Sequence, residues 1–413
     1  MKNLLKTTVC FTTMSLTAIL LPMNVMANEG EAKTITIAWT NIMESQQEIW
    51  EKYIFEPFEE KHPEVTIDFQ CLPDLQNTVR VQVAAGAGPD MFYMDSVDIP
   101  DYASTNRILS LENYRKEYNL DDSMYDWAIR SCLYEDEMYA LPASVEATAM
   151  TYNKNLLDQL GKDVPTNREE FVDVCNAALE AGLIPVSFGY SGANLLLTWP
   201  YEHYLTCYAG GEKTAQLLKG EITFDDPDIK GAFELLKADW DAGYINDKKS
   251  GAITNDEARI LFANQKAVFN YEGPWLILAD GAAKTWDFEW GQCAWPSMKD
   301  GTPAGSAITL GEAIGINANS QVSDLCMEMM MDFYSNEELM AQAVAEGFST
   351  PAVPIDSAAY PEDMDENIRK ALDAQNENMN LKQLDMRHGD FSLPKQQPSL
   401  MIIWIRYFMT KWI

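Results

Sequence analysis

Apolar runs of strand length alternate with longer amphipathic segments at the beginning of the chain. The runs at 34–39, 65–71 and 91–94 are predicted to be buried strands. Between them, residues 41–60 and 75–84 repeat their apolar side chains at the spacing of a helix. This strand–helix–strand rhythm predicts a parallel sheet with right-handed crossovers, and ligands of such sheets bind at the carboxyl ends of the strands.

Helical spacing dominates the middle of the chain, from Leu156 to Leu218. Asn167 precedes one amphipathic segment, and Asp226 or Asp228 is expected to cap another that runs to Ala242. The remaining pattern predicts a helix over 255–263, strands over 267–271, 288–294 and 308–316, a helix over 323–334 and a loop over 347–354. The chain is therefore expected to be an α/β protein.

The stretch 139–157 has the features of a connection between two folded units. A strand-like run ends at Pro142, a segment of small side chains follows, and a second apolar run covers 149–152. Asn153 is placed where the N-cap of a helix is expected. Because Glu146 is the only acid in this run of small residues, the pattern favours a cleft wall over a solvated loop.

Several motifs occur in the order found in one family of proteins. Residues 139–157 contain Y-A-L-P, then Glu146, then Y-N-K-N-L-L, and this resembles a signature of the extracellular solute-binding proteins of ABC importers, family 1, the maltose-binding-protein-like carbohydrate type. Further matches are Gly86-Ala-Gly-Pro-Asp90, Thr198-Trp-Pro200, 262–269, Gly273-Pro-Trp275 and 313–320. The resemblance implies a two-lobed periplasmic-binding-protein-like fold of type II, in which each lobe is a mainly parallel sheet flanked by helices and a hinge joins the lobes.

The resemblance and the strand–helix rhythm together predict lobes of discontinuous sequence. Lobe one is expected to contain residues 34–143 and 304–334, and lobe two residues 148–300 and 337–390. The chain is expected to cross between them near 143–146, 300–304 and 335.

Sugar recognition is the chemistry that the resemblance implies. The chain has 11 tryptophans, sugar rings stack on aromatic faces, and their hydroxyls pair with Asp, Glu and Asn. The family match makes Trp275 the stacking residue, against the alternative that it packs in the core, as Tyr93 and Trp295 are expected to do. The predicted ligand contacts are Trp275, Glu146, Asn41, Asp95, Glu312, Trp199 and Glu44.

Two departures limit what the resemblance implies about the ligand. Leu196 replaces a stacking tyrosine that precedes the TWP motif in maltose-type proteins, and Met94 replaces a tryptophan of the first lobe's cleft. Maltodextrin is therefore not favoured, and the sugar class stays open. A solute-binding protein would deliver its carbohydrate ligand to permease subunits in the membrane and is expected to act as a monomer.

Net charge narrows the possible partners. The formal charge is −33, so nucleic acids and anionic membrane surfaces would be repelled. An acidic, solubilising surface explains this charge, and a cationic solute such as a polyamine is the alternative.

No sequence motif favours catalysis. The three histidines, His62, His203 and His388, lie outside metal and nucleophile motifs, and no P-loop or G-x-S-x-G is present. A secreted glycoside-active enzyme with paired carboxylates stays as a minor alternative. The prediction is a binding protein without catalytic residues, cofactor or metal.

The first 27 residues resemble a secretory signal. Lys2 and Lys6 precede an apolar run, and Val25-Met-Ala27 forms a cleavage site. A lipid anchor is not expected because Cys10 comes too early, so the protein is predicted to be exported to the periplasm or the extracellular space. Six scattered cysteines remain, for which buried thiols are favoured over disulfides: Cys71, Cys132, Cys175, Cys207, Cys293 and Cys326.

The end of the chain differs in composition from the rest. Residues 387–413 carry a net charge of +3, and the stretch from Leu400 is almost entirely apolar. A divergent final helix and a membrane segment are two interpretations of the atypical hydrophobic tail, residues 391–413. We favour a third, a shift of the reading frame near Arg387 that leaves a foreign tail, because charge, composition and length change together.

Overall fold

The computed structural model describes residues 32–380 apart from 41, 43, 190–202, 219, 247–252, 274, 279–284 and 306. The predicted signal segment and the hydrophobic tail lie outside this range. Within it, no helix combines the length and the apolar character needed to span a membrane.

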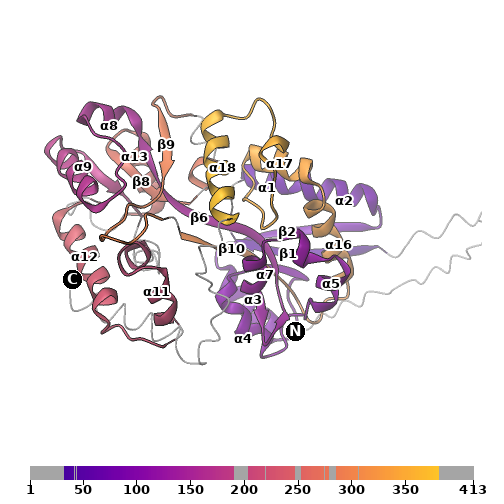
Figure 1. Cartoon of the computed structure of the whole chain (residues 1–413). Coiled ribbons are helices and arrows are strands. Elements are labelled where there is room, and N and C mark those ends of the chain that lie inside the picture. The colour runs from indigo at the N-terminus through magenta and orange to yellow at the C-terminus, as the bar shows by residue number, and fades with distance from the viewer. Residues whose placement is uncertain are drawn as a thin grey trace, which may run out of the picture.

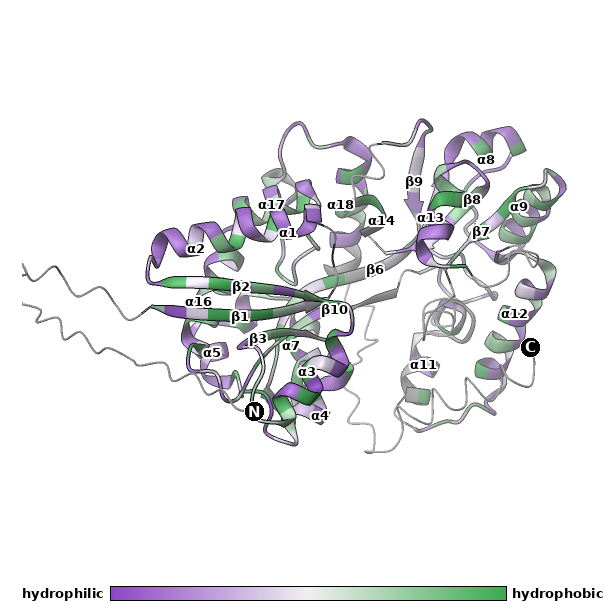
Figure 2. Cartoon of the chain, turned by 180° about the vertical axis from the view of Figure 1, so that it is seen from behind, coloured by the Kyte–Doolittle hydropathy of each residue, from purple (hydrophilic) through white to green (hydrophobic). Residues whose placement is uncertain are grey.

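Three parallel strands begin the sheet, as the alternating pattern predicted. Strand β1 (Lys33–Thr40) lies between β2 (Val65–Leu72) and β3 (Met91–Met94). The segment after β1 forms α1 (Glu44–Trp50), a π-helical turn η1 (Glu51–Phe55) and α2 (Glu56–Lys61), and α3 (Leu75–Ala84) joins β2 to β3. Figure 2 shows hydrophobic residues along β1 and β2.

The central stretch is one continuous strand, β6 (Leu141–Asn153), where the sequence suggested two runs separated by a small-residue segment. The first half pairs antiparallel with β10 (Ala307–Ile316), and the second half with β8 (Ala267–Glu272) and β9 (Trp290–Cys293). Pairing partners supply backbone hydrogen bonds along its whole length, so the small residues extend the strand instead of interrupting it. Figure 1 shows β6 passing through the middle of the molecule.

The strand order is β2-β1-β3-β10-β6-β8-β7, and β9 also pairs with β6. The pairs β1–β2, β1–β3 and β7–β8 are parallel, whereas the described pairs made by β6 and β10 are antiparallel. The predicted parallel pairing therefore holds away from the two crossover strands. Strand β7 (Ile184–Ser187) lies in a region that the sequence analysis assigned to helices, and its four residues are too few to show a period.

Helices cover both parts of the sheet, and several begin at the predicted caps. Asn153 accepts a hydrogen bond from the Leu156 amide at 2.9 Å and caps α8 (Lys154–Leu160). Asn167 caps α9 (Arg168–Glu180), and Asp226 caps α12 (Pro227–Ala242). The other described elements are η2 (Ser96–Asp98), α4 (Ile99–Ala103), α5 (Glu112–Glu117), α6 (Leu120–Ser123), α7 (Asp126–Ser131), β4 (Leu133–Tyr134), β5 (Glu137–Met138), η3 (Leu205–Ala209), α11 (Gly211–Leu218), α13 (Asn255–Ala263), α14 (Trp275–Leu278), α16 (Ser323–Tyr334), α17 (Glu337–Glu346), η4 (Ser357–Ala359) and α18 (Glu366–Asn380).

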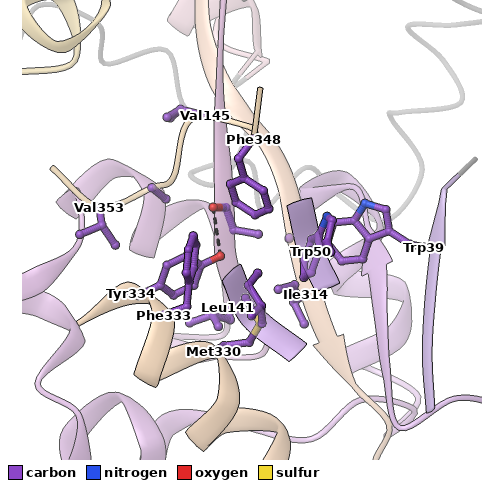
Figure 3. Close-up of a cluster of buried hydrophobic side chains, with 14 of the residues drawn as sticks. Trp39, Trp50, Leu141, Val145, Ile314, Met330, Phe333, Tyr334, Phe348 and Val353 are labelled. Carbon is purple, nitrogen blue, oxygen red and sulfur yellow. Dashed lines mark hydrogen bonds between the residues drawn. The ribbon is translucent and has the colours of Figure 1, made fainter. Parts of the chain in front are cut away.

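The buried side chains form two clusters. One surrounds Trp39, Trp50 and Phe333 and is drawn in Figure 3, where the Tyr334 hydroxyl donates to the Ala143 carbonyl at 3.2 Å. The other contains Phe269 and Trp295, which confirms the predicted core position of Trp295. Tyr93 is only partly buried, although its ring packs edge-on against Trp39.

Helix α17 contacts an element from the beginning of the chain. Residues 337–390 were expected in lobe two. Met340 and Val344 lie in the same cluster as Trp50, and Lys52 Nζ lies 2.8 Å from Glu346 Oε1. Only two residues separate α16 from α17, and so short a connection keeps consecutive helices adjacent. Helix α18 follows and lies between α17 and β9 (Figure 1).

Candidate functional site

Acidic residues occur where the strands β3, β10 and β6 lie side by side. Met94, the last residue of β3, pairs with Ala313 in β10, so Asp95 and Glu312 each lie one residue beyond that pair. On the other side of β10, Thr309 pairs with Glu146 in β6. The register therefore brings three of the predicted ligand contacts onto adjoining parts of the sheet, Asp95 just after β3, Glu312 in β10 and Glu146 in β6.

Two neutral donors hold the Asp95 carboxylate. Tyr93 donates its hydroxyl to Oδ1 at 2.7 Å, and Gln76 Nε2 in α3 donates to Oδ2 at 2.7 Å. Each carboxylate oxygen has a second lone pair, so the group can still accept a hydrogen bond from a hydroxyl of a ligand. The sequence analysis missed Gln76 and placed Tyr93 in the core, because neither residue belongs to a motif.

A second acid lies just behind Asp95. Burial, and to a smaller extent the charge of Asp95, raises the pKa of Asp98 to about 6 from its ordinary value of 3.8. Arg80, 3.9 Å from Asp98 Oδ1, acts in the opposite direction. The three-residue spacing of Asp95, Asp98 and Asp101 was the signal in the sequence that could have identified this group.

Glu312 occupies an irregular position in β10. The register with β6 shifts on both sides of Glu312, which pairs with Ser144. Burial raises the pKa of the Glu312 carboxyl, and the nearby hydroxyls of Ser144 and Ser349 offset part of that rise. A bulge of this kind redirects a side chain, and bulges are common next to binding sites.

A third chain segment joins β6 and β10 at this point. The amide of Val145 donates to the Thr350 carbonyl at 2.8 Å, and Ser144 forms an isolated bridge with Pro351. The predicted loop 347–354 thus runs along β6 beside the bulge. The crossover therefore consists of three passages of the chain held by backbone hydrogen bonds.

The other half of β6 leads to the Gly273-Pro-Trp275 motif. Strand β8 ends at Glu272, which pairs with Ala149 in β6, and α14 begins at Trp275. Trp275 therefore comes shortly after a strand that is hydrogen-bonded to β6. That strand ends opposite Ala149, three residues after Glu146 in β6. The described residues do not include the side chains of Trp275 and Glu146.

The remaining predicted contacts are less informative. Glu44 is exposed at the start of α1. Asn41 and Trp199 lie outside the described residues. Met94, which replaces a family tryptophan, is buried and points to packing instead of ligand contact.

His203 is a buried ring held by packing contacts. His203 Nε2 lies 3.1 Å from Thr148 Oγ1, the ring stacks on Trp295, and burial lowers the pKa of His203 to about 3, so this ring is neutral. The six cysteines of the described part are free thiols. Within that part, no group of three or more His, Cys, Asp or Glu could hold a metal ion.

Comparisons with known proteins show the family of this chain. Residues 43–340 match the model of the bacterial extracellular solute-binding protein family. The chain is 24% identical over 324 residues to the multiple sugar-binding protein of Streptococcus mutans, covering 71% of this chain and 70% of that protein. It is 25% identical over 285 residues to the galactooligosaccharide-binding protein of Bacillus subtilis, covering 67% of this chain and 63% of that protein.

Solved structures agree on the fold. A chitin oligosaccharide binding protein superposes with a TM-score of 0.70 at 20% identity, covering 83% of this chain and 86% of that one. Such a likeness shows the fold, which is the two-lobed α/β type of periplasmic binding proteins. Since the family model spans most of the sequence, the chain belongs to the family of bacterial extracellular solute-binding proteins.

Proposed function

We propose that this protein binds a sugar or oligosaccharide between its two lobes and delivers it to the permease of an ABC transporter. The observation that carries the proposal is the strand register, in which Asp95 directly follows β3 while Glu312 and Glu146 lie in the adjoining strands β10 and β6. The relatives named above bind multiple sugars, galactooligosaccharides and chitin oligosaccharides, which supports a carbohydrate ligand.

The lobes divide at the middle of β6. Lobe one contains β1, β2, β3, β10 and the first half of β6, and lobe two contains the second half with β7, β8 and β9. Helix α17 goes with lobe one, since Glu346 of α17 pairs with Lys52 of η1 at 2.8 Å. The three passages at the crossover form the hinge. Ligand contacts both lobes only in the closed form, so binding shifts the open–closed equilibrium.

The carboxylates and Trp275 have complementary chemical roles toward a sugar. The carboxylate of Asp95 accepts a hydrogen bond from a ligand hydroxyl, while Tyr93 and Gln76 hold the carboxylate in place. Glu146 and Glu312 offer further acceptors, and Trp275 stacks on the C–H face of a ring. Asn41, Glu44 and Trp199 complete the proposed set. The ligand is bound and released without chemical change. The protein acts as a monomer and is exported without a lipid anchor.

A thermal-shift screen tests the proposal, with mono- and oligosaccharides as ligands and spermidine as the cationic alternative. A ligand that binds only the folded protein raises the melting temperature, and the stabilisation grows with the logarithm of the ligand concentration relative to Kd. Stabilisation by a saccharide, with the sugar recovered intact, is the expected result. Stabilisation by spermidine alone, or hydrolysis of the sugar, would contradict it. The mass of the exported protein, expected to begin at Asn28, tests the signal segment and the absence of a lipid.

A further inference from the structure

Glu272 is a buried acid at the junction of β8 and the Gly273-Pro-Trp275 motif. It is the last residue of β8, its side chain is 2% exposed, and it pairs with Ala149 at the point where β6 enters the second lobe. A buried carboxylate is costly unless it is paired and hydrogen-bonded. A neighbouring group must therefore hold it.

Arg259 of α13 supplies that partner with a side-on fork. Its Nε lies 3.0 Å from each carboxylate oxygen of Glu272, and its Nη2 lies 2.5 Å from Oε1. The guanidinium also reaches Asp256 Oδ1 at 3.1 Å. Planar, bidentate pairs of this kind fix direction as well as distance, which a lysine ammonium does not.

Helix α13 is itself fastened to the sheet, so the fork has a rigid base. Thr254 and Glu257 form a capping box at its first turn. Ser187 in β7 donates to the Ala258 carbonyl of α13 at 3.3 Å and lies 3.2 Å from the Phe269 carbonyl of β8. Asn270 Nδ2 donates to the same serine oxygen at 3.0 Å. The position of Arg259 is thus set by contacts with both strands.

We propose that Arg259 and Glu272 are positioning residues for ligand binding: their fork fixes the end of β8 and thereby the start of α14, at which Trp275 lies. This inference rests on the proposed function, since it requires Trp275 to contact the sugar. Stability alone does not explain the pair, because apolar residues of similar volume can replace a buried ion pair without loss of stability. The pair instead connects α13 to the end of β8, three residues before Trp275.

The chain offers a matched control in the same lobe. Arg168 at the start of α9 makes a similar fork with Asp239 of α12, with Nη1–Oδ2 and Nη2–Oδ1 distances of 2.5 and 2.6 Å. Asp239 is 1% exposed, and the two arginine side chains are exposed to 27% and 28%. This pair joins two helices and does not touch the end of β8. Loss of its fork should lower stability without moving Trp275.

The experiment measures Kd by calorimetry for the saccharide that stabilises the wild type most, and the melting temperature alongside. R259K keeps the charge and loses the fork, and we expect Kd to rise about tenfold. R168K should lower the melting temperature comparably and leave Kd within about twofold. The double variant R259M/E272M fills the same space with apolar side chains. Its melting temperature should be close to that of the wild type, while its affinity for the saccharide should be reduced as in R259K.

The outcomes separate a positioning role of the Arg259–Glu272 pair from a purely stabilising one. Wild-type affinity in R259K or in R259M/E272M would overturn the positioning role and leave the proposed function intact. An equal loss of affinity in R168K would show a general effect of destabilisation and would overturn it as well. A wild type that binds none of the saccharides would overturn the proposed function and this inference with it.

Discussion

The hydroxyl of Tyr93 donates a hydrogen bond of 2.7 Å to Oδ1 of Asp95, the first residue after strand β3. The same tyrosine ring packs edge-on against the buried Trp39, with 5.5 Å between the ring centroids. Tyr93 therefore connects the apolar core of the first lobe to the carboxylate that we assign to the ligand. A core residue and a ligand-orienting residue are here the same side chain.

Replacing Tyr93 by phenylalanine separates these two roles. The ring stays in place, while Asp95 loses one of the two donors that orient it. We expect ligand affinity to fall by about 0.5–1.5 kcal/mol, the usual worth of a neutral hydrogen bond, with a smaller change in stability. Calorimetry measures the change, and Tyr244→Phe, which removes a 2.9 Å bond to Asn176 in the second lobe, is the control. Equal affinity in Tyr93→Phe and the wild type would show that Asp95 does not depend on this donor.

The partly buried carboxyl of Asp98 predicts a specific dependence of stability on pH. Its pKa of about 6 in the folded chain exceeds the ordinary 3.8, so the folded protein holds this proton more tightly than the unfolded chain. The free energy of unfolding should therefore decrease as the pH rises from about 4 to about 6 and then level off. Asp98→Asn removes this contribution and should stabilise the protein by about 1–3 kcal/mol at pH 7.

Denaturant unfolding at several pH values measures the difference in the free energy of unfolding between the wild type and Asp98→Asn. The other acids titrate equally in both proteins, so their contribution cancels in this difference. Asp101→Asn controls for the loss of an acid from the same surface, since Asp101 is exposed. A difference between wild type and Asp98→Asn that does not vary between pH 4 and 7 would disagree with a partly buried acid of raised pKa.

Much of the fold could be predicted from the sequence because many of its signals are local. Strands β1 to β3 show apolar alternation, and Asn153, Asn167 and Asp226 cap helices through amides two or three residues away. The continuity of β6 could not be predicted, because it depends on pairing with β10, more than 150 residues later in the chain. The contact of α17 with η1 could not be predicted for a related reason, since Lys52 and Glu346 are far apart in sequence.

The candidate site was predicted less completely than the fold. The family motif suggested Glu146, and the expected strand ends suggested Asp95 and Glu312. The strand register places all three on adjoining parts of the sheet. Tyr93, Gln76 and Arg259 were missed because a residue that orients another need not belong to a motif. Their roles follow only from contacts across separate elements.

Trp275→Ala tests the stacking residue directly. A buried aromatic contact contributes about 1–3 kcal/mol, so sugar affinity should fall by that amount while the protein remains folded. Trp127→Ala is a suitable comparison, because Trp127 is a partly buried tryptophan of α7 in the first lobe. Unchanged calorimetric affinity in Trp275→Ala would remove this residue from the site.

The bond from Tyr334 to the Ala143 carbonyl fastens α16 to β6 beside the crossover. Tyr334→Phe should lower the free energy of unfolding by about 0.5–1.5 kcal/mol, because the carbonyl loses a buried donor. Chemical denaturation measures this loss. An unchanged midpoint and slope would indicate that the amide of Ala352, 3.3 Å from the same carbonyl, already satisfies it.

Isothermal titration calorimetry of the purified protein against mono- and oligosaccharides tests the central claim most directly. The account predicts saturable binding of one saccharide per chain, weakened by Asp95→Asn and by Trp275→Ala, with the sugar recovered unchanged. Absence of binding to every saccharide, or affinity that neither substitution alters, would contradict a carbohydrate site at the junction of β3, β10 and β6.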